Sequence, residues 1–562
     1  MLIFALAILP AHATITQESE PPQPANDDIE WWPMFHHDVQ LTGFTPAESP
    51  DTNKILWTNQ IESDVWFSSP AIVQDDLLIG IGERYGKHPS TRQEAKEFYD
   101  THLFMKDTCF TDLLITPHAL SAEAGKLYHL NANTGDILWD FVANGSVFSS
   151  PVIDNGLVYF VSTDSSSYLG ELYCLDIDSG DEVWSLPVMT GFATPTIDEG
   201  NLYLQTIDPD NYNGTLLCLN AATGEELWNH TIGYIDFSLY TAPALANGKV
   251  FFTSIDVTTG IHCKLTCLDQ STGQLLWATK MSEMNFGYAL SSPVITTDNA
   301  YVISADTEGV EDFWCVLSCF DTTNGSILWN YTMKEDTTDE LAFSSPAVAY
   351  GNVYFACVGS GWTYGKVICL DADTGAIQWV RKSNDAYTAS SPVISEGKVF
   401  IGGVNLTLFE GNLYCLDAYT GEPLYKAFIE NGFIDSTPAI AAETLYLCSQ
   451  TGRICAFQDA VKIGDIKGGL ATVKIDLSNV GADDVENIQG TMTVTGGILD
   501  RINMTSNYSI SILESQTTDT IRLFPVLGFG KIQVTVTVEM TGVNTVVKKA
   551  EGFVLGIFVI IL

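Results

Sequence analysis

The stretch LYCLDIDSGDEVW (172–184) contains the pattern that decides the fold. Apolar residues surround a cysteine, an aspartate follows, a Ser-Gly pair comes soon after, and a tryptophan stands four residues beyond the glycine. The pattern recurs as LYHLNANTGDILW (127–139), LCLNAATGEELW (217–228), LTCLDQSTGQLLW (265–277), LSCFDTTNGSILW (317–329), VICLDADTGAIQW (367–379) and LYCLDAYTGEPLY (413–425). Such a repeat indicates an array of equivalent units.

A second pattern is interleaved with the first: an aromatic or apolar residue, two small residues and a proline. Its eight copies end at Pro70, Pro151, Pro195, Pro243, Pro293, Pro346, Pro392 and Pro438. Alternating runs such as GLVYFVS (156–162) and GKVFIGG (397–403) lie between the two patterns. Each unit therefore offers four short strands separated by turn residues. We predict an all-β chain whose main part is a β-propeller, with one four-stranded blade per unit.

The repeated residues have physical roles in this fold. The Asp or Asn side chain can accept backbone hydrogen bonds and set the turn. The glycine supplies the positive φ of that turn, and we expect it at Gly135, Gly180, Gly224, Gly273, Gly325, Gly375 and Gly421. The aromatic residue stands on the outermost strand and can wedge against the neighbouring blade. These aromatic residues are Trp57, Trp139, Trp184, Trp228, Trp277, Trp329, Trp379 and Tyr425.

The strand count predicts eight blades over residues 31–460. The last unit lacks its own outer strand, whereas the run KILW (54–57) precedes the first proline pattern. We expect the strand 54–58 to complete blade eight, because closure removes an exposed sheet edge. Residues 461–562 lack the repeat and alternate apolar with polar residues, which predicts a small immunoglobulin-like β-sandwich.

These Thr-Gly-x-x-x-Trp repeats and Ser-Ser-Pro strands resemble the pyrroloquinoline quinone (PQQ) repeat family. The opening WWPMFHHDVQLTGFTP (31–46) resembles the segment that precedes such propellers in secreted proteins. The family includes quinoprotein alcohol dehydrogenases and a non-enzymatic lipoprotein propeller of outer-membrane protein assembly. The C-terminal stretch DLSNVGADDVENI (476–488) resembles adhesion-type sandwich modules of surface proteins.

For an enzyme, the resemblance implies PQQ on the propeller axis, calcium ligands of Glu, Asn and Asp, an Asp base and a disulfide between adjacent cysteines. No two cysteines are adjacent in this sequence, and none of the catalytic set matches residue by residue. We therefore expect a propeller nearer to the non-enzymatic type, without catalytic residues, cofactor or metal site. PQQ with calcium belongs to the enzymatic alternative.

The composition limits the partners. The formal net charge is −44, from 69 Asp and Glu against 25 Lys and Arg, which argues against nucleic acid and anionic lipid as partners. No apolar run is long enough for a transmembrane helix. Residues 1–13 are expected to be a secretory signal peptide and 14–30 a linker. The apolar C-terminal stretch 553–562 is expected to be a buried last strand, with a partial anchor or sorting signal as the alternative. Export agrees with eight Asn-x-Ser/Thr glycosylation sequons, at Asn144, Asn213, Asn229, Asn324, Asn330, Asn405, Asn503 and Asn507.

Seven of the twelve cysteines stand at one repeat position, where a small apolar side chain packed between blades is expected. They are Cys174, Cys218, Cys267, Cys319, Cys369, Cys415 and Cys455. Two disulfides are possible in an oxidising compartment, Cys448–Cys455 across a turn and Cys357–Cys369 on consecutive strands. The Asp-rich turn 176–181 loosely resembles a calcium loop, but its length favours an Asx turn.

Blade one carries an insertion, 83–126, in which 91–106 has helical spacing. It is rich in His and basic residues, including His88, Arg92 and His102. Because it connects second and third strands, it should lie at one rim as a structural cap, a lid for an anionic ligand or a metal site. The same rim should present the aromatic residues Tyr212, Trp314, Trp362 and Tyr364, either as a ligand surface or as packing between loops.

These observations favour an exported cell-surface glycoprotein that binds or scaffolds a protein or glycan without catalysis. The first alternative is a PQQ-dependent oxidoreductase, and the second is a hydrolase that uses carboxylates of the funnel. No nucleophile-elbow motif supports the hydrolase.

Overall fold

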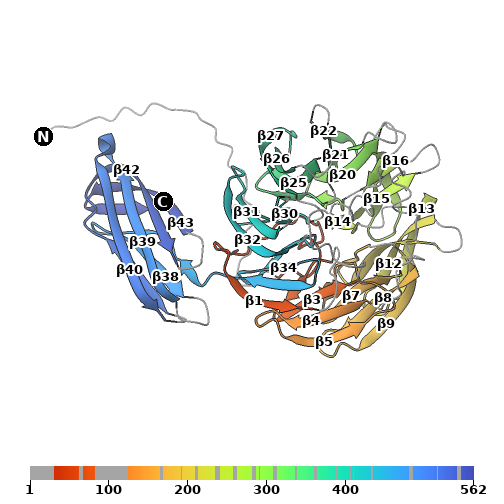
Figure 1. Cartoon of the computed structure of the whole chain (residues 1–562). Coiled ribbons are helices and arrows are strands. Elements are labelled where there is room, and N and C mark those ends of the chain that lie inside the picture. Colours follow the sequence, from red (N-terminus) through yellow and green to blue (C-terminus); the bar gives the residue numbers. More distant parts are fainter. Residues whose placement is uncertain are drawn as a thin grey trace.

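The structure is a computed structural model of the chain. It describes residues 31–61, 68–82, 125–164, 169–190, 193–208, 213–234, 241–256, 262–281, 287–289, 291–307, 313–335, 338–342, 344–359, 364–386, 390–405, 407–408, 410–431, 434–479, 485–514, 517–540 and 546–561. Sheets arranged around a ring form most of it, and a second β module lies beside the ring (Figure 1). In the described residues, no helix is long and apolar enough to cross a bilayer.

Each repeat forms a four-stranded antiparallel unit with the strands in sequence order. The first four units are β2 (Ala71–Val73), β3 (Asp76–Ile81), β4 (Lys126–Asn131) and β5 (Ile137–Val142); β6 (Val152–Asp154), β7 (Leu157–Thr163), β8 (Leu169–Asp176) and β9 (Glu182–Met189); β10 (Thr196–Asp198), β11 (Asn201–Ile207), β12 (Asn213–Asn220) and β13 (Glu226–Tyr234); and β14 (Ala244–Ala246), β15 (Lys249–Asp256), β16 (His262–Asp269) and β17 (Leu275–Lys280).

The next three units have a first strand in two pieces, both paired with the second strand. They are β18 (Gly287–Ala289) with β19 (Val294–Ile295), β20 (Asn299–Thr307), β21 (Phe313–Asp321) and β22 (Ile327–Glu335); β23 (Thr338–Leu341) with β24 (Ala347–Ala349), β25 (Asn352–Gly359), β26 (Gly365–Asp371) and β27 (Ile377–Ser383); and β28 (Asp385–Ala386) with β29 (Val393–Ser395), β30 (Lys398–Asn405), β31 (Glu410–Asp417) and β32 (Pro423–Asn431). Because β22 also pairs with β23, the first two of these units form one continuous sheet.

The eighth unit combines both ends of the repeat region. Its strands are β33 (Ala439–Ala441), β34 (Thr444–Cys448), β35 (Arg453–Phe457) and, as the outer strand, β1 (Ile55–Gln60). The pairing of β1 with β35 is antiparallel, with Trp57 opposite Ala456 and Thr58 opposite Cys455. The run KILW is therefore part of the outer strand of this unit, and the chain closes the sheet with a segment from before the first repeat.

Turn chemistry and a tryptophan join seven of the eight units to the unit that follows. In the turn after β26, Asp371 Oδ1 accepts hydrogen bonds from the N–H and hydroxyl of Thr374, at 2.8 and 2.6 Å. Gly375 follows with φ +69°, and a Cβ there would lie 2.7 Å from the Trp329 ring of the preceding unit. Trp329 Nε1 also donates to the Ala372 carbonyl at 3.0 Å. The same glycine contact joins Trp57, Trp139, Trp184, Trp228, Trp277 and Trp379 to Gly135, Gly180, Gly224, Gly273, Gly325 and Gly421.

The recurrent cysteine lies in an aromatic row. In the sixth unit, Cys369 pairs with Tyr354 on one side and Trp379 on the other, and the two ring centroids are 6.1 Å apart. A small side chain between the rings leaves room for this approach, which explains the cysteine of the repeat. One assignment is wrong. In the eighth unit the residue between Tyr446 and Trp57 is Ala456, and Cys455 stands one residue earlier, on the opposite face of its strand.

Residues 461–561 form two antiparallel sheets around their own buried core. The first contains β36 (Val461–Ile463), β37 (Lys467–Gly468), β38 (Val473–Asn479) and β41 (Thr518–Leu523). The second has the order β40 (Ile502–Leu513), β39 (Val485–Gly496), β42 (Gly528–Glu539), β43 (Val546–Gly556) and β44 (Phe558–Ile561), with the 3₁₀ turn η1 (Ile498–Asp500) after β39. Lys462 on β36 contacts the repeat region through ion pairs with Glu48 and Glu443.

Candidate functional site

The axis of the ring is the first place to look for a site, because quinoprotein enzymes are expected to hold their cofactor there. The first strand of each unit faces this axis, and neighbouring first strands contact one another, as β33 does with β2 and β2 with β6. The small residues before each proline stand where these strands begin. The Ser-Ser-Pro pattern is therefore the part of the repeat that builds the axis.

Hydroxyl groups of this pattern form a hydrogen-bonded ring. The N–H of the second small residue in one unit donates to the hydroxyl of its counterpart in the next unit, at 2.9 to 3.2 Å. The members of the ring are Ser69, Ser150, Thr194, Ala242, Ser292, Ser345, Ser391 and Thr437. Ala242 donates to Ser292 but offers no hydroxyl to Thr194. These hydroxyls are buried and used in joining units, so their visible role is structural.

A segment before the first repeat covers the first strands on the axis side. Six of these strands donate a backbone N–H, at 2.7 to 3.0 Å, to carbonyls within residues 32–43. The donor–acceptor pairs are Ile72–Trp32, Ile153–Pro33, Leu245–Val39, Ile295–Gln40, Val348–Thr42 and Ile394–Gly43. In the sequence this segment stands out by resemblance only, and its role at the axis was not predicted. A signal was available, because the first strands of any propeller carry backbone N–H groups at their inner edge, and buried N–H groups need acceptors.

His36 and Trp32 anchor this axial segment in the ring. His36 is fully buried, and its Nδ1 lies 3.0 Å from the Leu41 carbonyl. Burial lowers the pKa of His36 to about 4, so the imidazole is neutral at pH 7. The indole of Trp32 is also fully buried, and the backbone of Trp32 exchanges two hydrogen bonds with Ile72. These side chains fill space at the axis.

The described axis does not fit PQQ with calcium. Within the described ranges, no group of three or more His, Cys, Asp or Glu side chains could hold a metal ion. Asp435 stands just before the hydroxyl pattern of the eighth unit and is buried, but its carboxylate accepts a hydrogen bond from Gln450. One carboxylate held by an amide does not supply a Glu-Asn-Asp ligand set and a separate base.

Only part of the predicted rim lies in the described residues. Trp314 begins β21 and is 7% exposed, so its prediction as a rim ligand is wrong: the ring is packed inside. Tyr364 precedes β26, and the ammonium of Lys382 lies 3.8 Å from its ring centroid. A cation of the protein therefore already covers one face of that ring. The other predicted rim residues, Tyr212, Trp362, His88, Arg92 and His102, lie outside the described residues, as does most of the insertion 83–126.

The two predicted disulfides are also wrong. Cys357, Cys369, Cys448 and Cys455 are buried thiols. In the β34–β35 hairpin, Cys448 faces Ile454 while Cys455 faces Leu447, so the two thiols point to opposite faces. Cys357 faces Lys366 and Cys369 faces Tyr354, which again gives opposite faces. Burial raises the pKa of Cys369 to about 12 and that of Cys455 to about 11, so neither is a nucleophile at neutral pH.

Two solved structures share the fold. Quinohemoprotein alcohol dehydrogenase from Comamonas testosteroni has a TM-score of 0.51 at 12% identity, covering 78% of this chain and 83% of that chain. A europium-containing methanol dehydrogenase has a TM-score of 0.50 at 10% identity, covering 81% of this chain and 91% of that chain. At such identities the likeness concerns the fold alone. No curated protein matches this sequence significantly.

A family model gives the relationship at the level of sequence. The model described as outer membrane protein assembly factor BamB matches residues 116–185, 165–253 and 212–461. These ranges contain all seven of the quoted Gly-x-x-x-Trp or Tyr repeats in full. Because the matches together extend over 116–461, more than half of the chain, this protein belongs to the PQQ-like repeat family whose model carries that description.

Proposed function

We propose that this protein is an exported, non-catalytic scaffold: an eight-bladed propeller, joined to an immunoglobulin-like adhesion module, that holds a protein or glycan at the cell surface. The observation that carries the proposal is the axial segment. Carbonyls of residues 32–43 accept the inner-edge N–H groups of six first strands, so a segment of the chain itself binds the strands at the axis. The family description as an assembly factor agrees with a scaffold.

Two observations support eight blades as part of this proposal. Eight four-stranded units can be traced in the described residues, and Thr437 of the last unit donates to Ser69 of the first. The acidic balance suits an exported protein, since like charges keep copies apart in solution. Export through residues 1–13 and glycosylation of the sequons remain part of the proposal.

The enzymatic alternative is tested by adding cofactor to the purified full chain. We expect no dye-linked alcohol oxidation with PQQ and calcium, and no PQQ binding by titration calorimetry. The variant Asp435→Asn removes the buried carboxylate near the axis and serves as the matched control. PQQ binding by the native chain that Asp435→Asn abolishes would establish the quinoprotein alternative and overturn the scaffold.

The binding role is tested at the rim. Ile81 and Lys126 pair directly at the ends of β3 and β4, so a short Gly-Asn turn can replace residues 83–124 without disturbing the sheet. We expect the native chain to capture ligands on glycan and peptide arrays. The shortened variant should keep its melting temperature and lose that capture if the insertion is a binding lid. Capture that persists in the variant assigns the insertion to a structural cap, and no capture by either protein contradicts a binding role.

A further inference from the structure

The outer face of the five-stranded sheet in the C-terminal module becomes apolar at one end. Phe529 on β42, Leu555 on β43 and Phe558 on β44 are successive cross-strand neighbours, and they are 60%, 54% and 58% exposed. The alternate residues Val554 and Val559 are buried. The sheet therefore fills its core with one apolar set and presents a second set to solvent, where an antiparallel sheet usually carries polar residues.

Loops at the same end extend this row. Leu499 in η1 is 78% exposed, and Phe524 and Leu527, between β41 and β42, are 69% and 51% exposed. The backbone holds these loops against the row, because Gly497 N donates to the Lys531 carbonyl at 2.6 Å and Gly528 pairs with Gly556. We call this surface the apolar end; it consists of Leu499, Phe524, Leu527, Phe529, Leu555 and Phe558.

The charge around the apolar end differs from that of the chain as a whole. Of the 69 acidic residues, none lies between Asp519 and Glu539 or after Glu551. Three exposed cations lie beside its loops and strands: Arg501, Arg522 and Lys531. Two exposed acidic residues accompany them, Asp500 beside Leu499 and Glu551, which forms an ion pair with Lys531 at 2.5 Å. An apolar surface with cations at its edge matches the boundary between lipid tails and phosphate headgroups.

We propose that the apolar end inserts into the surface of a lipid bilayer, with Arg501, Arg522 and Lys531 at the level of the headgroups. Insertion removes large apolar side chains from water. This burial, rather than charge attraction, supplies the free energy of binding for an acidic chain. The overall acidity opposes anionic lipid at long range, whereas at this end the three cations outnumber the two acidic residues Asp500 and Glu551. The membrane contact is independent of what the propeller binds.

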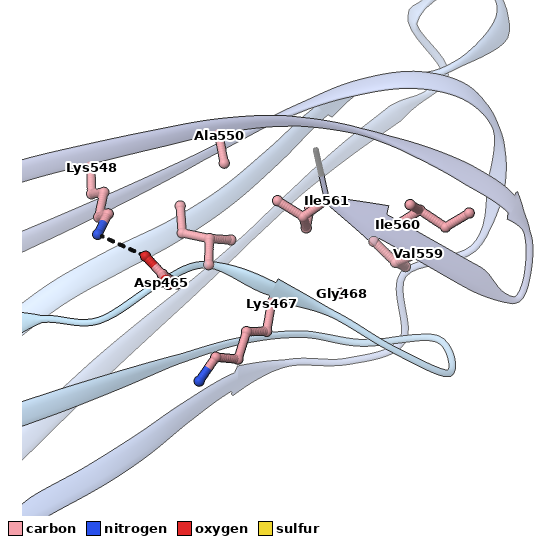
Figure 2. Close-up of a pocket in the computed structure, with 9 residues that line it drawn as sticks. Asp465, Lys467, Gly468, Lys548, Ala550, Val559, Ile560 and Ile561 are labelled. Carbon is pink, nitrogen blue, oxygen red and sulfur yellow. Dashed lines mark ion pairs between the residues drawn. The ribbon is translucent and has the colours of Figure 1, made fainter. Parts of the chain in front are cut away.

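A hollow in the same module is the other candidate site. A hollow of about 620 Å³ lies between β37, β43 and β44, as Figure 2 shows. Lys548 and Asp465 form an ion pair across it at 3.6 Å, and Asp465 is 86% exposed. The six residues of the apolar end do not line this hollow. The apolar end is thus separate from the hollow and requires an apolar partner of its own.

Vesicle flotation of the full chain tests the insertion. We expect the native protein to float with phosphatidylcholine vesicles, to remain bound in high salt, and to bind no more weakly when phosphatidylglycerol is added. The variant Leu555→Glu should lower the bound fraction about ten-fold or more, because it places a charge in the hydrocarbon region. The control Ile512→Glu changes a side chain that is also 54% exposed but lies at the opposite end of the same sheet, and it should bind as the native chain does.

Three results would overturn the proposal. The native chain could fail to float, Leu555→Glu could float as well as Ile512→Glu, or the native chain could sediment as a dimer that Leu555→Glu converts to a monomer. The last result would assign the apolar end to a second copy of the chain. Circular dichroism of both variants establishes that each is folded, and Phe529→Ser, which adds no charge, serves in place of Leu555→Glu should that variant misfold.

Discussion

The backbone N–H of Thr437 donates a 3.1 Å hydrogen bond to Oγ of Ser69, 368 residues away in the sequence. This bond links the last unit to the first, and the pairing of β1 with β35 links the same two regions at the outside of the ring. The ring is therefore sealed twice, near the axis by hydroxyls and at the periphery by a strand. Non-local links of this kind stabilise the ring because the chain between them is already folded.

Loss of the Thr437–Ser69 hydrogen bond should lower the stability of the ring, and a hydroxyl at position 242, where the hydroxyl ring is interrupted, should raise it. Ser69→Ala leaves the Thr437 N–H without its acceptor, which costs about 1–2 kcal/mol for a buried donor. Ala242→Ser supplies a hydroxyl that can accept a hydrogen bond from the Thr194 N–H, and it should raise the melting temperature. Thermal melts of the full chain compare the two variants. Equal melting temperatures would show that the hydroxyl ring adds nothing to stability.

The axial segment should depend on the absence of a side chain at Gly43. This residue has φ +65°, and a Cβ would lie 2.9 Å from Ala347 Cβ and 3.2 Å from the Pro392 carbonyl. Gly156 has a similar φ of +78° with nothing within 4 Å of its Cβ position. Both Gly→Ala changes incur the left-handed strain of about 1 kcal/mol, but only Gly43→Ala also displaces the segment. We expect Gly43→Ala to melt lower than Gly156→Ala; an equal loss would mean that the segment is not tightly seated.

The parts of the fold that the sequence predicts are those set by local chemistry. An Asx turn, a positive-φ glycine and a tryptophan recur at fixed spacing, and each acts within one unit or on the next one. Four-stranded units, the Trp–Gly contacts and the outer position of the KILW run follow from counting these signals. The apolar end did not follow from such counting, since Phe553–Leu562 was expected to form a buried strand whereas Leu555 and Phe558 are exposed.

The predictions that failed depend on the register of paired strands or on how deeply a side chain is buried. Cys448 and Cys455 flank their turn symmetrically in the sequence, but the hairpin pairs Leu447 with Cys455, and a shift of one residue changes the face of a strand. Trp314 was assigned to a loop, but β21 begins at Phe313 and carries it into the packed interior. The axial segment has no repeat of its own, so only the three-dimensional position of the first strands reveals what it does.

The outer seal should fail when Trp57 is shortened. Trp57 Nε1 donates to the Ala132 carbonyl at 2.9 Å, and its ring covers Gly135. Trp57→Ala should destabilise the ring by about 3 kcal/mol and expose β1 to limited proteolysis. Trp184→Ala removes an equivalent contact, Nε1 to Ala221, in a unit whose strands are consecutive, so it should destabilise without releasing a strand. Identical cleavage patterns would contradict a special role for β1.

The connection between the ring and the C-terminal module should respond to pH through Asp459. Its carboxylate accepts hydrogen bonds from Asp51 N at 2.7 Å and Thr52 Oγ1 at 2.6 Å, and burial raises its pKa from 3.8 to about 6. Between these values the folded chain retains a proton that the unfolded chain has released, so the contribution of Asp459 to stability falls as pH rises from about 4 to 6. The melting temperature of the native chain relative to Asp459→Asn should therefore decrease over this window. A difference that is flat or increases with pH would contradict the buried carboxylate.

The cysteines should be free but unreactive in the folded protein. Eleven of them are buried thiols in the structure, and burial raises the pKa of Cys267 and Cys319 to about 12. Thiol reagents attack the thiolate, so these residues should remain unlabelled at pH 8. After unfolding without a reducing agent, all twelve cysteines of the chain should react, because the eleven that the structure describes are reduced. Mass spectrometry counts the labels, and a loss of two or four labels that a reducing agent restores would mean that disulfides form after all.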